Sequence, residues 1–128
     1  MQNKPSDSEL EIMQILWEKG PLTVRNVNDS LNLERRVGYT TTLKIMQIMT
    51  DKTILTRDTD NRSHIYSPAL KPEEVQSSIL DHVLQTVFNG NRSNLILQAL
   101  GNHSASNKEM DEIRALIEKL EDKEDGVL

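Results

Sequence analysis

Residues 40–67 read TTTLKIMQIMTDKTILTRDTDNRSHIYS, and the spacing of apolar side chains changes within this stretch. The first part repeats at helical intervals, which predicts a helix capped by Thr40. Its inward positions are Thr42, Ile45, Met46 and Met49. Beyond Lys52, the segments 53–57 and 64–67 are rich in β-branched and aromatic residues and predict two strands, with turn-forming residues between them. The stretch therefore predicts a helix followed by a β-hairpin.

Two further helices are predicted before this stretch. Ser6 and Glu9 have the Ser-x-x-Glu spacing of a capping box, which marks a helix start. Gly20–Pro21 ends this helix, and Thr23 is placed to cap the second one. The apolar positions of the two helices are Leu10, Met13, Leu16 and Trp17, and then Val24, Val27 and Leu31. Three helices followed by a hairpin is the order of a winged helix-turn-helix, which we expect over residues 1–71.

A helical second domain is predicted over residues 72–128. We expect a hinge between Pro68 and Pro72, then an amphipathic helix over 73–88, a short apolar helix, and a last helix that opens with a capping box at Ser106. Apolar residues on the last helix repeat at spacings of three, four and three, as in a coiled-coil seam. The whole chain is therefore expected to be mainly α, with a three-helix dimerisation domain. The predicted dimer contacts are Val75, Ile79, Val83, Met110, Ile113, Ile117 and Leu120.

Charge is divided unevenly along the chain. The formal charge of the whole sequence is −5, which by itself argues against a nucleic-acid binder. Residues 1–71 hold ten basic and nine acidic residues, a net of +1, whereas residues 72–128 hold five and eleven, a net of −6. The acidity therefore belongs to the predicted second domain. Hydrophobic residues make up 36% and aromatic residues 3%, which suggests small cores that are completed by a second chain.

No arrangement of residues points to an enzyme, a cofactor or a metal site. The sequence has no cysteine, which excludes thiolate metal sites and cysteine nucleophiles. His64, His82 and His103 are far apart and lack metal-ligand spacing. There is no glycine-rich phosphate loop and no Gly-x-Ser-x-Gly motif. Without a secretion signal or a run of about 20 apolar residues, a cytoplasmic protein with no membrane insertion is expected.

The polar face of the helix after Gly38 is the predicted DNA-reading surface. In a helix-turn-helix, the second helix of the motif enters the major groove and its N-terminal residues reach base edges. Hydroxyl and Lys side chains can bond phosphates or base edges, and Gln can pair with adenine. An Arg in the wing can reach phosphate or a narrow minor groove. The predicted DNA-binding residues are Tyr39, Thr40, Thr41, Lys44, Gln47 and Arg62.

The same residues are also compatible with functions other than DNA binding and with an ordinary solvent-exposed surface. The helix face fits an ordinary solvated surface, and Leu43 on its outer side fits either contact with thymine methyl groups or packing against a neighbouring element. Asp58 and Asp60 fit a merely solvated hairpin tip. Winged helices also serve as protein-interaction adaptors without DNA binding, and a direct small-molecule sensor is a third hypothesis. Salt-dependent binding to a duplex separates the repressor from the adaptor.

The chain resembles the penicillinase-repressor family over nearly its whole length. Residues 6–27, SDSELEIMQILWEKGPLTVRNV, are similar to the opening of that family, and residues 38–42, GYTTT, resemble the start of its recognition helix. The resemblance implies a homodimeric repressor on a double-stranded, pseudo-palindromic operator with TACA/TGTA-like half-sites. It implies further that the C-terminal helices interlock the two subunits. In the β-lactam-responsive members, a membrane sensor-protease triggers cleavage of the repressor.

Three positions depart from the pattern of the family. Gln98–Ala99 stands where an Asn-Phe pair is cut in the cleaved members, so cleavage at this point is not expected. The Cys-x-Cys metal site of the copper-responsive members is missing from this cysteine-free chain. Thr53 stands where the family usually has Gly after the recognition helix. Because Gly suits a left-handed helix end, we expect a turn at Thr53 that is either strained or differently shaped.

Overall fold

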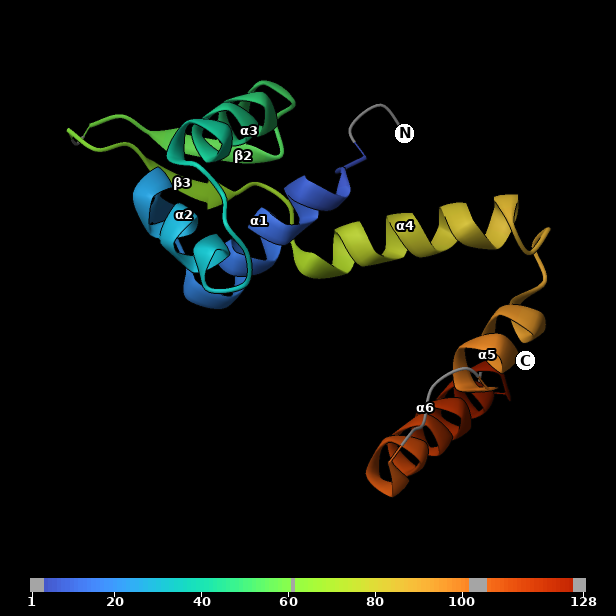
Figure 1. The fold of residues 1–128 in the computed structure, drawn as a ribbon. Coiled ribbons are helices and arrows are strands. Elements are labelled where there is room, and N and C mark those ends of the chain that lie inside the picture. Colours follow the sequence, from blue (N-terminus) through green and yellow to red (C-terminus); the bar gives the residue numbers. More distant parts are fainter. Residues whose placement is uncertain (1–3, 61, 102–105, 126–128) are drawn as a thin grey trace. The chain divides into compact units, whose positions relative to one another are not determined.

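The computed structural model describes residues 4–60, 62–101 and 106–125, the last four of these by their backbone alone. Figure 1 shows its elements. They are α1 (Asp7–Lys19), β1 (Leu22–Thr23), α2 (Val24–Asn32), α3 (Tyr39–Asp51), β2 (Leu55–Asp58), β3 (Ile65–Pro68), α4 (Pro72–Thr86), α5 (Arg92–Gly101) and α6 (Asn107–Asp125). Contacts within the chain group Met1–Leu80 and Asp81–Leu128 into two compact units. Helix α4 contributes to both, and the domain boundary at residue 72 stays a prediction.

The first unit is a winged helix. Helices α1 to α3 pack with a three-stranded antiparallel sheet in which β3 is the central strand. Figure 1 labels these helices and the strands β2 and β3. Strands β2 and β3 form the predicted hairpin, with Arg57 opposite Tyr66. Strand β1 pairs with the other edge of β3, and the sequence did not predict it because two residues are too few to show an alternating pattern. The predicted fold class, a winged helix followed by further helices, is confirmed.

The core of the first unit is built from side chains that the three helices and the sheet turn toward one another. Its buried members are Ile12, Met13, Leu16, Val24, Val27, Leu31, Met46, Met49, Ile54, Leu55 and Tyr66. On α3 the buried apolar positions are three residues apart, as the helical pattern predicted. Leu43 packs against this core and is half-buried, so packing accounts for its apolar side chain.

The segment between β3 and α4 is bound to the first unit at two points. The backbone N–H of Ala69 donates to the Ile54 carbonyl at 3.0 Å. The indole Nε1 of Trp17 donates to the Leu70 carbonyl at 2.9 Å, and the Leu70 side chain packs against the core. A hydrogen bond in such a partly buried place is costly to leave unmade, so these two bonds fix the chain where it enters α4.

Side chains cap the starts of α1 and α2 as predicted, but not the start of α3. At α1, the Ser6 N–H donates to the Glu9 carboxylate at 2.8 Å, and the Glu9 N–H donates to Ser6 Oγ at 3.3 Å. At α2, the Asn26 N–H donates to Thr23 Oγ1 at 3.2 Å. Helix α3 begins at Tyr39 after an extended Gly38, so the prediction that Thr40 caps it is wrong. The helix starts earlier because the turn before it is held from α2, as described below.

Thr53 follows α3 in a left-handed conformation, with φ 67°. Its N–H donates to the Thr50 carbonyl at 3.0 Å, and the Ile54 N–H donates to the Met49 carbonyl at 3.0 Å. These two bonds close the C-terminal end of the helix and require the left-handed residue between them. A β-branched side chain is strained there, because its branches crowd the backbone at positive φ. Of the two outcomes expected at this position, strained or differently shaped, the positive φ of Thr53 supports the strained turn.

Replacing Thr53 with Gly is expected to raise the free energy of unfolding by about 1 kcal/mol, because glycine adopts positive φ without strain. The gain is smaller than the strain relieved, since glycine also makes the unfolded chain more flexible. Thr53→Ala is the matched control and should gain less, because alanine keeps a Cβ at the same φ. Urea unfolding of the three proteins measures the effect, and a Gly variant less stable than the wild type would contradict it.

The second unit buries little of its own apolar surface. Helix α6 begins with the predicted capping box, in which the Glu109 N–H donates to Ser106 Oγ at 3.1 Å. Among the described residues after Leu80, the side chain of Leu84 alone falls in the buried class, at 8% exposed. Large apolar side chains that remain exposed are Val87, Ile96, Leu97, Leu116, Ile117 and Leu120. None of the described helices has the length and apolar character to span a membrane.

Candidate nucleic-acid interface

Helix α3 has one apolar and one polar face. Thr42, Met46 and Met49 lie on the buried face. The predicted residues Thr40, Thr41, Lys44 and Gln47 are all exposed. Tyr39, the fifth predicted residue of this helix, is 46% exposed and lies beneath Arg25 of α2, whose guanidinium carbon is 5.8 Å from the ring centre. The helix thus brings hydroxyl, ammonium and amide groups to one exposed surface, and these groups can bond base edges or phosphates.

The turn before α3 is held by two asparagines of α2. Asn28 Nδ2 donates to the Val37 carbonyl at 3.1 Å and to Thr42 Oγ1 at 2.8 Å. Asn32 Nδ2 donates to the same carbonyl at 2.9 Å, and its Oδ1 accepts from the Val37 N–H at 3.1 Å. These bonds join α2, the turn and the first turn of α3. The polar face of α3 is therefore presented by a fixed scaffold, which a precise reading surface requires.

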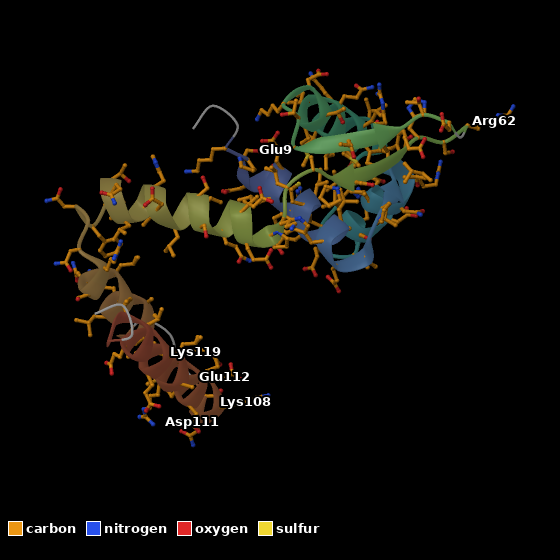
Figure 2. All side chains as sticks on the ribbon, turned by 180° about the vertical axis from the view of Figure 1, so that it is seen from behind. Glu9, Arg62, Lys108, Asp111, Glu112 and Lys119 are labelled. Atoms are coloured by element: carbon orange, nitrogen blue, oxygen red, sulfur yellow. The ribbon has the colours of Figure 1, made fainter. Side chains whose placement is uncertain are left out.

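The other end of α3 is held by an ion pair with α1. Lys52, directly after the helix, donates from Nζ to both carboxylate oxygens of Glu9 at 2.9 and 3.1 Å. The Glu9 residue is only 3% exposed; Figure 2 labels it. Burial raises the pKa of Glu9, but hydrogen bonds from the Ser6 backbone and the Lys52 ammonium outweigh it, so that the pKa lies below its ordinary value. The sequence suggested only a helix-terminus role for Glu9, since Lys52 is distant in the chain.

The wing is the hairpin of β2 and β3, and Arg62 lies at its tip (Figure 2). Its side chain is exposed and forms no ion pair with any residue that the structure describes. Asp58, which could have offset its charge, instead accepts a hydrogen bond from the Asp60 N–H at 2.9 Å within the turn. Arg62 is therefore not neutralised by any described residue, and its contact with phosphate stays a prediction. Asn61, its neighbour in the predicted wing, lies outside the described residues.

A cavity of about 430 Å³ separates the wing from the starts of α2 and α3. Its lining is Thr23, Val24, Arg25, Tyr39, Leu43, Arg62, Ser63, His64 and Tyr66. Two of the predicted residues, Tyr39 and Arg62, meet there. Sequence reasoning missed Arg25 and assigned His64 no role. The one signal in the sequence that could have indicated Arg25 was its position, as a basic residue in the first turn of α2, the helix before α3.

Two arginines in the loop before α3 differ in their partners. Arg35 Nε donates to Glu11 Oε2 at 3.2 Å, and this hydrogen bond lowers the pKa of Glu11. Arg36 is exposed in the loop before α3.

Within the described part of the chain, no group of three or more His, Asp or Glu side chains could hold a metal ion.

The predicted dimer residues lie at different depths. Val75 is buried within the chain at 5% exposed. Four of the others are half-buried: Ile79, Val83, Met110 and Ile113. Ile117 and Leu120, on the last turns of the predicted seam, are 47% and 65% exposed. Gln98–Ala99, the pair at the family cleavage position, lies inside α5 with both residues exposed.

Comparison with known proteins gives one consistent result. The model of the family described as "Penicillinase repressor" matches residues 5–119. The transcriptional regulator BlaI of Mycobacterium tuberculosis is 28% identical over 117 residues, which is 90% of this chain and 83% of that protein. A penicillinase repressor of Staphylococcus aureus is 21% identical, over 92% of this chain and 94% of that protein. The methicillin resistance regulatory protein MecI of Mammaliicoccus sciuri is 22% identical, over 89% and 93% respectively.

Proposed function

Because this chain belongs to the penicillinase-repressor family, whose members are transcriptional regulators and not enzymes, we propose that it is a homodimeric repressor that binds a pseudo-palindromic operator. The observation that carries the proposal is the exposed polar face of α3, which is held at both ends. Beside it, Arg62 on the wing forms no ion pair with the residues that the structure describes. In this arrangement α3 enters the major groove and the wing contacts the backbone beside it. The proposed place of action is the cytoplasm.

The side chains of the interface have unequal proposed roles. Thr41 and Lys44 lie in the first two turns of α3, where side chains reach base edges, so they affect which sequence is bound. Thr40 does not cap the helix, and its hydroxyl is therefore available to a phosphate or a base. Arg62 contacts phosphate, which positions the protein without selecting sequence.

The apolar side chains left exposed after Leu80 support the homodimer. An isolated unit with Leu84 as its one buried apolar residue in the described part has almost no core of its own. Exposed apolar surface of this kind is removed from water when a second chain covers it. A two-fold dimer also matches a two-fold operator, since each subunit then reads one half-site.

A membrane sensor-protease is the proposed trigger that releases the operator, by the likeness to the β-lactam-responsive members. The site of its cut is proposed to differ from theirs, because Gln98–Ala99 replaces the Asn-Phe pair and lies within a helix. A cut inside a helix requires local unfolding first.

Footprinting of the purified protein on the region upstream of its own gene identifies the operator, and two substitutions then test the roles. Lys44→Ala is expected to weaken operator binding by about 1–3 kcal/mol and to relax specificity at one position of each half-site. Arg62→Ala is expected to weaken binding to operator and random duplex alike. It should also lower the slope of log affinity against log salt by about one unit per neutralised phosphate, hence about two per dimer.

Lys119→Ala, which removes a positive charge from α6, is the matched control and should leave both duplex affinities unchanged. Affinities are measured against salt for the three variants and the wild type. If Lys44→Ala and Arg62→Ala bound operator and random duplex as the wild type does, a protein-interaction adaptor would be the better assignment.

A further inference from the structure

The charged residues that line the cavity between the wing and the starts of α2 and α3 are all basic. Arg25 and Arg62 enter its lining from two different elements, and His64 adds an imidazole from the strand side. The described lining residues include no Asp or Glu. Two guanidinium groups in one lining raise the positive electrostatic potential inside the cavity, which favours an anion there. The charge of the lining therefore suits a compact anionic group.

Arg25 is held in place without being neutralised. Its guanidinium lies over the Tyr39 ring, 5.8 Å from the centre, an interaction that orients an Arg while leaving its N–H groups free. It forms no ion pair with any residue in the described ranges. Arg35 and Lys52 differ in this respect, because each is paired with a glutamate. The planar fork of Arg25 thus remains available for two parallel hydrogen bonds to an oxyanion.

Other donors converge on the same cavity. The first residues of α2, Val24 and Arg25, belong to its lining, and the first turn of this helix contains no acidic residue that would compete for its N–H groups. Tyr66 is 1% exposed, lines the cavity, and makes no side-chain hydrogen bond to the described residues. Its hydroxyl therefore has no partner among the described residues. It is a further donor for a ligand.

We propose that this cavity is a binding site for a phosphate group, with Arg25 as its principal cation and Tyr39 as the residue that positions Arg25. Phosphate offers the several acceptor oxygens that guanidinium forks, a helix start and a hydroxyl can bond together. The group can belong to the operator backbone, in which case the inference rests on the proposed function. It can equally belong to a free phosphorylated small molecule, for which a volume of about 430 Å³ is ample.

Titration of the full chain with inorganic phosphate tests the site without any duplex. Backbone amide NMR signals of Val24 and Arg25 are expected to shift and saturate, at an ionic strength held constant with chloride. Arg25→Gln should weaken the binding at least about tenfold, Arg25→Lys should weaken it less, and Arg36→Gln should leave it unchanged. Shifts that are spread over the surface, do not saturate and persist in Arg25→Gln would overturn the proposal.

Operator duplexes that carry one neutral methylphosphonate at successive backbone positions then distinguish the two sources. If an operator phosphate occupies the cavity, neutralising it weakens wild-type binding, and the same neutralisation has no further effect on Arg25→Gln. If phosphate saturates the cavity but no backbone position is coupled to Arg25, the source is a free phosphorylated molecule. A chain that binds no duplex would refute the proposed function, and the phosphate titration would still decide the site.

Discussion

Replacing Ile117 with Asp is expected to convert the proposed homodimer to a monomer and to abolish the tight operator binding proposed for it. Ile117 is 47% exposed in the single chain, so the charge should not disturb the fold of one subunit. In the dimer, the loss of a buried Ile side chain costs about 2–5 kcal/mol per site, and two-fold symmetry counts it twice. Because each 1.4 kcal/mol is about a factor of ten, the dimer dissociation constant should rise by at least about a thousandfold.

Ala115→Asp is the control for this prediction. Ala115 lies on α6 on the side away from the predicted seam, so the same charge placed there should leave the dimer intact. Sedimentation at micromolar concentration measures the oligomeric state, and operator titration follows the loss of binding. An intact chain that sedimented as a monomer without any substitution would contradict the homodimer itself.

Replacing Lys52 with Met is expected to lower the free energy of unfolding by about 2–3 kcal/mol. The substitution leaves the Glu9 carboxylate, whose side chain is 4% exposed, with one of its two partners removed. Breaking a fully buried pair costs about 3–5 kcal/mol. The Lys52 side chain is 35% exposed, so solvent screening reduces the figure. Arg35→Met breaks the solvent-exposed pair with Glu11 and is the control, which should lower the free energy of unfolding much less because solvent screens that pair.

Lowering the pH should reduce the difference in the free energy of unfolding between the wild type and Lys52→Met. The pKa of Glu9 is lower in the folded state than its ordinary 4.5, so the contribution of the pair is fully present above that pH. It is lost as the pH falls through the folded-state pKa, because the protonated carboxyl no longer attracts the ammonium. Urea unfolding from pH 7 to pH 3 measures this. A difference that stayed constant across the range would show that Lys52 acts through packing alone.

The sequence predicted features that depend on neighbours in the chain. The Ser6 and Ser106 capping boxes place both partners within one helical turn, and the left-handed turn at Thr53 follows from local helix-end geometry. The order of three helices and a hairpin followed from the spacing of apolar residues, which changes from a helical to a strand pattern after Lys52. The polar face of α3 was likewise visible in the spacing of its residues.

Features that depend on tertiary contacts could not be predicted in this way. The start of α3 at Tyr39 is set by asparagine side chains of α2, and they outweigh the capping preference of Thr40. The pair of Glu9 and Lys52 joins residues 43 positions apart. The contribution of Arg25 to the cavity requires the wing and two helix starts to meet. No local pattern in the sequence encodes any of these three arrangements.

The hydrogen bond from Trp17 to the Leu70 carbonyl has a spectroscopic consequence. Trp17 is the single tryptophan of the chain, so the indole fluorescence comes from one place, the contact between α1 and the segment that leads into α4. Indole emission depends on the polarity around the ring and on the bond made by its N–H. Release of that segment from α1 would expose the ring to water and move its emission to longer wavelengths. The native chain therefore carries an optical reporter of the point at which the winged helix passes into α4.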